Sequence, residues 1–385
     1  MVYRKLGRTG LSVSEIGMGL EHLLDKDERT VVDTIRAAVR GGVNYLDCHV
    51  GHDYKEEIVE YDGYIKLGRA LEGLREKLFI SYVTYYDNRT DDYVKPRFEY
   101  FLKALDTDYA DVYIIQFCDK IADYELVTKE NGALDFAKKL KAEGKIRFIG
   151  LSTHSSAIAL KAIESGEFDV LMYPVNPAFD VLTDEEQYKT DDLGTLWDAA
   201  HDFSAGEKTG IHPRKNVYTE CERNNIGLVA MKPFAGGFIF GVEENAGFTP
   251  VNLISYALTQ TGVSTVVPGC TKPQEINEIL EYCNSSEFQR DYSEAVAKSR
   301  WCVTGNCIYC NHCLPCVVNI SIGQVNRLID FIDYNKDDVQ KTRERYNALS
   351  AKASACTECG ICEERCPFDV KVIDRLKYAI ELFEE

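Results

Sequence analysis

The stretch IRFIGLSTHSSAIALKAIESG, residues 146–166, decides the fold class of this chain. Its first half is a short apolar run typical of a buried strand. Its second half carries apolar residues at helical spacing and ends at a glycine, which often terminates a helix. A strand followed directly by an amphipathic helix is the repeating unit of proteins with a parallel sheet. The stretch therefore predicts an α/β fold in which helices cover the strands.

The same unit recurs along most of the chain. Further apolar runs, each followed by a helical stretch, lie at residues 14–20, 44–48, 78–83, 111–117, 168–175, 226–233 and 264–269. Strict strand–helix alternation over eight units favours a (β/α)8 TIM barrel over a doubly wound sheet, with the active site at the carboxyl ends of the strands. A long polar insertion, at about residues 183–215, is either a lid or interface or a surface decoration.

Two cysteine runs predict a second, smaller domain. Of the 14 cysteines, eight lie in CIYCNHCLPC (307–316) and CTECGICEERCP (356–367). The second run has the C-x2-C-x2-C-x3-C-P spacing of bacterial ferredoxins, and the first is one residue shorter before its last cysteine. Structural zinc sites, the alternative, usually pair two C-x2-C knuckles. We therefore expect a barrel at residues 1–283 and a mainly helical, ferredoxin-like domain with two [4Fe-4S] clusters at residues 284–385.

The ferredoxin spacing also predicts how the thiolates are shared. In two-cluster ferredoxins the fourth cysteine of a run ligates the cluster of the other run. One predicted ligand set is therefore Cys307, Cys310, Cys313 and Cys366. The other is Cys356, Cys359, Cys362 and Cys316.

Charge and hydropathy exclude several classes of partner. The chain has 62 acidic and 44 basic side chains and a formal net charge of -18, which repels nucleic acids and anionic membrane surfaces. The N-terminus lacks the apolar core of a signal peptide, and no apolar run is long enough to span a membrane. We expect a cytoplasmic protein whose clustered cysteines bind metal rather than form disulfides.

Several stretches, in this order, resemble the aldo-keto reductase family. They are YRKLGRTGLSVSEIGMG (3–19), GGVNYLDC (41–48), IRFIGLSTHS (146–155) and VVPGCTKPQEINEIL (266–280). MKPFAGG (231–237) and the two cysteine runs are similar to the branch of that family with a C-terminal ferredoxin module. The resemblance covers residues 1–282 and implies a barrel that binds NADPH and passes a hydride to a carbonyl.

The resemblance implies four catalytic residues, of which Asp47 alone is plainly present. The lysine position at the end of the third strand falls near Val83, and the histidine position falls on Gln116. Three tyrosines compete for the proton-donor position: Tyr54, Tyr61 and Tyr64. A phenol with a pKa of about 10 is a poor acid at neutral pH without the lysine, so we expect ordinary carbonyl reduction to be weak.

Histidines close to the strand ends are alternative proton donors, because imidazole titrates near neutrality. They are His22, His49, His52 and His154. Each can equally be a loop or capping residue. Glu21 together with the first three also has the ligand types of a metal site, although nothing in the spacing singles it out.

A nucleotide site is expected after the last two strands. Gly269, Thr271 and Lys272 precede a helix, where backbone N–H groups favour phosphate, and a second loop contains Lys232, Gly236 and Gly237. The resemblance implies that Lys272 contacts the adenosine phosphate, whereas Ile279 stands in place of an asparagine that holds the adenine. The cofactor is either NADP(H) or a flavin nucleotide such as FMN, and an ordinary barrel loop is the alternative.

Together these features predict an oxidoreductase of an anaerobic cytoplasm, acting on a small carbonyl, unsaturated or aromatic substrate. Its electrons pass through the two clusters, which carry them singly, whereas NAD(P)H gives up two as a hydride. The alternatives are a conventional NADPH-dependent carbonyl reductase with a substituted proton donor and a non-catalytic electron-transfer subunit. Expected partners are the substrate and a ferredoxin or other redox protein, with a homo-oligomer possible.

Overall fold

A parallel barrel of eight strands forms the larger part of the protein. The computed structural model describes residues 1–49, 60–84, 91–182, 200–201, 213–243, 246–334 and 339–384. In chain order, the barrel strands are β3 (Met18–Gly19), β4 (Tyr45–Cys48), β5 (Phe79–Val83), β6 (Ala110–Ile115), β7 (Ile146–Ser152), β8 (Val170–Pro174), β9 (Gly227–Met231) and β10 (Val263–Val267). Each pairs in parallel with the next, and isolated bridges from Ile16 and Gly19 to Val266 and Gly269 nearly close the ring.

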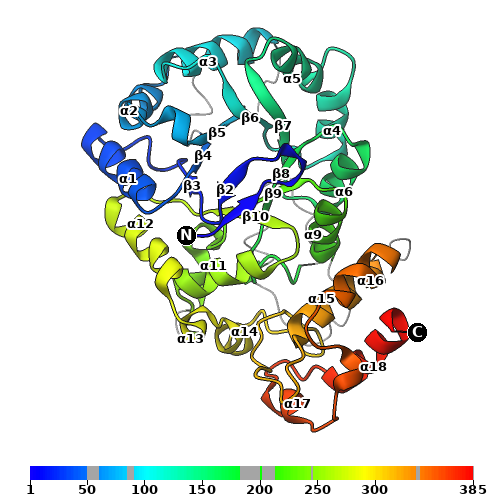
Figure 1. The fold of residues 1–385 in the computed structure, drawn as a ribbon. Helices are drawn as coiled ribbons and strands as arrows, with labels where there is room; N and C mark the ends of the chain where they lie inside the picture. The colour runs from blue at the N-terminus through cyan, green and yellow to red at the C-terminus, as the bar shows by residue number, and fades with distance from the viewer. Residues whose placement is uncertain are drawn as a thin grey trace.

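Helices surround this barrel, as Figure 1 shows. They are α1 (Glu28–Arg40), α2 (Asp62–Leu71), α3 (Asp91–Ala104), α4 (Ile121–Thr128), α5 (Ala133–Ala142), α6 (Ser156–Ser165), α9 (Pro213–Arg223), α10 (Phe238–Val242), α11 (Pro250–Thr259) and α12 (Pro273–Leu280). Residues 146–166 form β7 and α6, with Ser155 capping the helix and Gly166 ending it at φ 72°. The predicted barrel is confirmed, although the sequence pattern missed α4 and α10.

An antiparallel hairpin of β1 (Tyr3–Lys5) and β2 (Ser12–Ser14) covers the amino ends of the strands. Its Leu6, Leu11 and Val13 are buried with the apolar side chains that fill the barrel. Gly7 has φ 47°, and a Cβ on it would lie 2.2 Å from the backbone nitrogen of Gly227, so the close approach requires glycine. Because the hairpin covers this end, only the carboxyl ends of the strands are left for a site.

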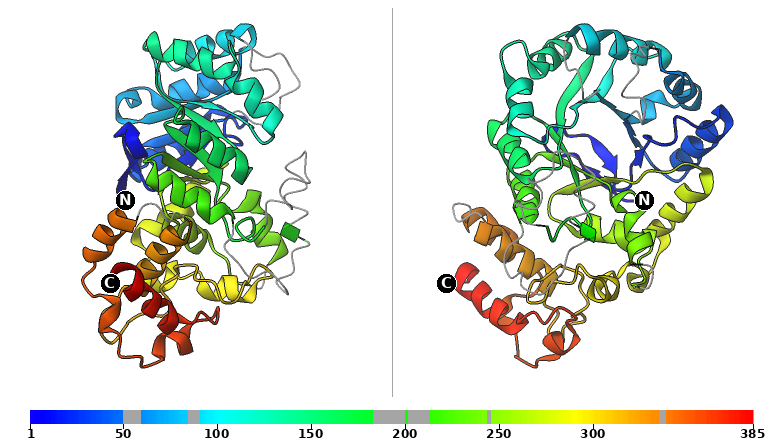
Figure 2. Two further views of the ribbon diagram at one scale, coloured as in Figure 1. Left: turned by 90° about the vertical axis from the view of Figure 1, so that its right-hand side faces the viewer. Right: turned by 180° about the vertical axis from the view of Figure 1, so that it is seen from behind.

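The cysteine-rich C-terminal region is helical, as expected. Its helices are α13 (Glu287–Arg290), α14 (Ser293–Lys298), α15 (Ile322–Tyr334), α16 (Val339–Asn347), α17 (Ile361–Arg365) and α18 (Val372–Phe383). Helix α15 packs against α18 and also contacts α9 of the barrel, so this region lies at one edge of the barrel (Figure 2). Among the described helices, none combines the length and the apolar character needed to cross a membrane.

Candidate active site and cluster-binding site

Polar side chains from three strand ends meet at the open end of the barrel. Asp47 lies in β4, His49 follows that strand, and Gln116 follows β6. The Gln116 side-chain nitrogen is hydrogen-bonded to Nε2 of His49. On the other side of the ring, His49 Nδ1 lies 3.6 Å from a carboxylate oxygen of Glu21, which follows β3. We call Glu21, Asp47, His49 and Gln116 the strand-top cluster.

Asp47 is a buried carboxyl, with 6% of its surface exposed. Burial raises its pKa to about 7, although the hydroxyl of Ser81, which donates to Asp47 Oδ1 over 2.8 Å, opposes the shift. The charge of Glu21 raises this pKa further, and the charge of Lys232 lowers it. A carboxyl with this pKa populates both protonation states near neutrality, so it can give or accept a proton.

His49 is the second titratable group of the cluster. Burial lowers the pKa of its imidazole, and the charge of Glu21 opposes that change. A neutral ring that accepts a hydrogen bond from Gln116 at Nε2 carries its proton at Nδ1, on the side that faces Glu21. His22 is at the edge of the cluster, with Nε2 4.0 Å from Glu21, and its side chain is half exposed. His52 and Tyr54 lie outside the described residues.

The other tyrosine candidates are engaged elsewhere. The hydroxyl of Tyr61 is hydrogen-bonded to Asp25. Tyr64 is buried, with its ring edge-on to Phe101 at 4.9 Å between centroids. Val83 is buried among the apolar side chains inside the barrel. Val83 therefore supplies no cation to the cluster, and among the described residues the lysine whose charge acts on Asp47 is Lys232, beyond β9.

His154 lies apart from the strand-top cluster and pairs with a residue that the sequence did not single out. Its Nδ1 lies 3.0 Å from Oδ2 of Asp119, which follows β6. The His154 ring packs on Phe117 at 5.0 Å between centroids. The signal that the sequence offered for Asp119 was its place shortly beyond a predicted strand, where barrel sites gather.

The expected phosphate loop is already paired with a carboxylate. Glu275 accepts hydrogen bonds from the Thr271 backbone nitrogen at 2.7 Å and hydroxyl at 3.0 Å. The same carboxylate lies 3.6 Å from Lys272 Nζ. An acid in this position caps the start of α12 and competes with any phosphate for the same donors. Gly269 pairs with Gly19 in a β-bridge at the closing edge of the barrel.

The second loop of the expected nucleotide site is a tight turn after β9. Lys232, at φ 51°, begins it, and its carbonyl accepts a hydrogen bond of 3.0 Å from the Asn176 side chain. Gly236 and Gly237 follow at φ 64° and 89°. These left-handed backbone angles favour glycine, so both glycines shape the turn whether or not a nucleotide binds there.

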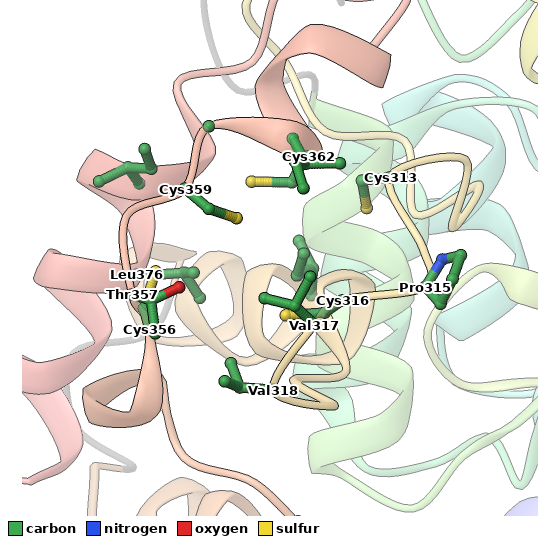
Figure 3. Close-up of a pocket in the computed structure, with 14 residues that line it drawn as sticks. Cys313, Pro315, Cys316, Val317, Val318, Cys356, Thr357, Cys359, Cys362 and Leu376 are labelled. Carbon is green, nitrogen blue, oxygen red and sulfur yellow. The ribbon is translucent and has the colours of Figure 1, made fainter.

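The eight clustered cysteines surround two hollows in the C-terminal region. The inner hollow is lined by Cys307, Cys310, Cys313 and Cys366. The outer hollow is lined by Cys316, Cys356, Cys359 and Cys362, and Cys313 borders it as well. Figure 3 shows the sulfur atoms of Cys359 and Cys362 pointing into the outer hollow, with Cys313 and Cys316 across from them. The cysteines that line each hollow include the predicted cross-ligated set, Cys313 borders both hollows, and the ligation itself stays a prediction.

The chemistry of these hollows suits iron–sulfur clusters. Burial raises the pKa of the Cys307 thiol to about 11 and that of Cys313 to about 12, so bare thiolates are unfavourable there and a cationic metal core would stabilise them. Within the described residues, no three His, Cys, Asp or Glu side chains are placed to hold a single metal ion. The thiols instead border wider spaces, as a four-iron core requires.

The inner hollow is tied to the barrel. Lys215 of α9 donates a hydrogen bond from Nζ to the backbone oxygen of Cys307 over 2.7 Å. The hydroxyl of Tyr292, which lies 2.8 Å from the hydroxyl of Thr259 in barrel helix α11, donates to the backbone oxygen of Ile308, also over 2.7 Å. The outer hollow faces solvent, since Cys359 is the exposed member of the eight cysteines. The two cluster sites therefore differ in environment, one against the barrel and one at the surface.

Comparison with known proteins identifies both parts of the chain. Residues 15–189 match the aldo/keto reductase family, and residues 306–371 match a 4Fe-4S dicluster domain, which implies two [4Fe-4S] clusters. The aldo-keto reductase YhdN of Bacillus subtilis is 23% identical over 325 residues, covering 76% of this chain and 92% of that protein. The NADH-specific methylglyoxal reductase of Escherichia coli is 21% identical over 324 residues, covering 76% and 96%.

Solved structures show the same barrel. The holo form of an aldo-keto reductase from Bacillus halodurans has a TM-score of 0.56 and 17% identity, covering 79% of this chain and 98% of that one. An aldo-keto reductase from Klebsiella pneumoniae in complex with NADPH has a TM-score of 0.50 and 16% identity, covering 74% and 91%. At such identities the likeness shows the fold alone.

Proposed function

We propose that this chain, which belongs to the aldo/keto reductase family and carries a C-terminal 4Fe-4S dicluster domain, exchanges electrons between its clusters and a small organic substrate at the barrel mouth. The substrate is a carbonyl compound or an unsaturated or aromatic one. When bound, the clusters supply or remove electrons one at a time. The barrel residues bind and orient the substrate and move its protons.

The contacts of two consecutive residues in α9 carry this proposal. Lys215 binds the backbone of Cys307 beside the inner hollow. Its neighbour Arg214 is fully buried and donates to the backbone oxygens of His154, at 3.4 Å, and Pro174, at 2.5 Å, which lie at the ends of β7 and β8. One short segment thus joins the inner cluster site to the carboxyl ends of the barrel strands, where family members perform their chemistry.

The strand-top cluster supports a departure from ordinary hydride chemistry. Val83 occupies the end of β5 and provides no charge to activate a phenol. Asp47, whose pKa burial raises to about 7, is suited to carry the proton itself, while Glu21 and Gln116 hold the ring of His49 between them. Asp47 thus gives the described part of the barrel a carboxyl that titrates near neutrality, beside the ring of His49.

The proposed organic cofactor is NADP(H) or FMN, bound between the loop after β9 and the start of α12. Relatives support a nicotinamide, since one is named for NADH and another was solved with NADPH. Glu275 opposes tight phosphate binding, because its carboxylate already accepts hydrogen bonds from the backbone nitrogen and the hydroxyl of Thr271. Absorbance and mass spectrometry of the small molecules released from anaerobically purified protein would identify the cofactor.

The proposal is tested by driving turnover with a one-electron donor. Anaerobic protein with reduced viologen should convert the substrate, found by screening carbonyl and unsaturated compounds, and Cys359→Ser should abolish that conversion. Cys283→Ser is the matched control, because Cys283 is a partly buried free cysteine outside both hollows. If Cys359→Ser reduces carbonyls with NADPH at the rate of the unaltered protein and viologen drives nothing, the clusters are structural and the proposal is wrong.

One observation favours a second candidate, a conventional NADPH-dependent carbonyl reductase. A buried Asp47 with a pKa of about 7 can protonate the developing alkoxide without help from a tyrosine. In that case Asp47→Asn should remove carbonyl reduction by NADPH, and loss of either cluster should leave it intact. Rates of turnover with reduced viologen and with NADPH therefore distinguish the two candidate functions.

A further inference from the structure

We propose that Asp119 and His154 form a second proton-transfer pair at the barrel mouth, distinct from the strand-top cluster. The inference rests on the proposed function, because it explains why a barrel supplied with single electrons needs another acid. The pair gives a proton to the substrate. The atom that receives it is the oxygen or carbon atom that must be protonated when electrons arrive without a hydride. The geometry of the pair, its burial and the electron balance each support it.

Asp119 fixes both the position and the tautomer of His154. Its Oδ1 accepts hydrogen bonds from the His154 backbone nitrogen at 2.6 Å and from the hydroxyl of Thr153 at 3.1 Å. Its Oδ2 faces His154 Nδ1 at 3.0 Å. With the Nδ1 proton directed at the carboxylate, Nε2 is the atom left to accept or give a proton. Orientation of an imidazole by a carboxylate is the arrangement that acid–base catalysis uses.

The other ring nitrogen of His154, Nε2, is a buried polar atom without a hydrogen-bond partner among the described residues. His154 as a whole is 7% exposed. A buried polar atom without a hydrogen-bond partner destabilises the folded protein. A histidine held only for structure would be expected to avoid that cost, whereas one that meets a substrate acquires its partner on binding.

The groups around the pair keep the Asp119 carboxylate charged. Burial raises the pKa of Asp119, but the charge of His154 and the hydrogen bonds from His154 and Thr153 outweigh it, so this pKa is lowered overall and the carboxylate stays ionised. Phe117 covers the ring from the β6 side without a charge. On the α9 side, Arg214 donates to the His154 backbone oxygen but is itself paired with Asp180 at 3.2 Å.

The electron balance requires two proton donors. Reduction of a carbonyl to an alcohol takes two electrons and two protons, one forming the O–H bond and one the C–H bond. A hydride brings both electrons together with the hydrogen of the new C–H bond, so one acid is enough. Electrons delivered singly by a low-potential donor bring no hydrogen, so both protons must come from the protein. The strand-top cluster is suited to one, and His154 Nε2 to the other.

The test compares the two kinds of reductant in three variants of the full protein. With reduced viologen, His154→Gln should lose at least tenfold in rate, and Asp119→Asn should lose rate and shift the pH profile to lower pH, because the imidazolium loses its carboxylate. With NADPH, the same variants should lose less of their rate than they lose with viologen, since hydride transfer needs one acid. Asp169→Asn, an ion-paired carboxylate beside Arg8 and Lys141, is the control that should change neither rate.

Each outcome decides between the two proposals. If viologen drives turnover but His154→Gln keeps its full rate, the second proton-transfer pair is wrong and the proposed function stands. If viologen drives nothing, the proposed function fails, and the pair is judged by the NMR titration of isotope-labelled histidine. A His154 ring that does not titrate between about pH 5 and 9, or titrates alike in Asp119→Asn, then overturns the pair.

Discussion

The ammonium group of Lys215 donates a hydrogen bond to the backbone oxygen of Cys307 over 2.7 Å, so a barrel helix places a positive charge beside the inner cluster site. Burial and the charge of Asp330 raise the pKa of the Cys307 thiol, and the charges of Lys215 and Arg375 oppose that rise. The outer site has a different setting, with Cys359 exposed to solvent. Since cations stabilise the more negative, reduced state of a cluster, the Lys215 charge should raise the reduction potential of the inner site.

Lys215→Met should lower the potential of one cluster. Loss of a partly screened unit charge is worth roughly 1 kcal/mol, or about 40 mV for a one-electron couple. A redox titration followed by electron paramagnetic resonance should show one signal shifting and the other unchanged, at full iron content. Lys298→Met is the matched control, because Lys298 is exposed and pairs with Glu294. Equal potentials in Lys215→Met and in the unaltered protein would show that this contact does not tune the cluster.

The shared ligation of the two clusters gives a second prediction. Cys366 lies in the second run but lines the inner hollow with three cysteines of the first run. Cys316 lies in the first run but lines the outer hollow. Cys366→Ser should therefore perturb the inner cluster and Cys316→Ser the outer one, each leaving about four of eight irons firmly bound. Iron analysis and spectra of the two variants check this, and damage to the cluster of its own run in either variant would contradict it.

The barrel was predictable because its evidence is spread over the whole chain. Each strand from β3 to β10 is a short apolar run before a helix, so an error in one unit does not change the fold. Single elements were harder to predict. Helix α4 was missed because IADYELVT, at residues 121–128, is followed by a second helical stretch, α5, before β7. Local periodicity does not tell one helix from two in such a connection.

The candidate site was predictable where ligands are close in sequence and less so where they are not. The cysteine sets follow from spacing alone, because a loop that wraps a cluster fixes its own ligands. The pairing of Asp119 with His154 joins residues 35 positions apart, and the sequence gives no periodicity for it. The strand ends identified His49 and Gln116 as candidates and grouped Glu21 with His49 as an alternative metal site, but only the folded barrel shows Gln116 hydrogen-bonded to His49.

Glu275 gives a third prediction, because it opposes an anion at the start of α12. Its carboxylate accepts hydrogen bonds from Thr271 and lies beside Lys272. Glu275→Gln keeps the size of the side chain and removes the charge, so affinity for NADP(H) should rise by roughly tenfold at low salt and by less at high salt. Fluorescence titration with NADP(H) measures this affinity. Glu278→Gln, in the same helix, is the control. Unchanged affinity would place the nucleotide phosphate elsewhere.

Asp47 gives the last prediction, a dependence of stability on pH with a definite sign. Burial raises its pKa in the folded protein to about 7, against about 3.9 in an unfolded chain. Between these values the folded state binds more protons than the unfolded state, so this group weakens the fold as pH rises from about 4 to 7 and adds no further change above that. The full effect is roughly 4 kcal/mol.

Asp47→Asn removes this titration but keeps an oxygen that can accept from Ser81. The variant should therefore gain stability relative to the unaltered protein as pH rises from 5 to about 8, while turnover at the barrel mouth falls because an amide does not act as an acid or base near neutrality. Thermal unfolding at a series of pH values measures the gain. Asp169→Asn, which breaks ion pairs with Arg8 and Lys141, should show no such gain. A stability difference that stays flat across this range would mean that Asp47 is already ionised at low pH, in which case it orients His49 rather than carrying the proton.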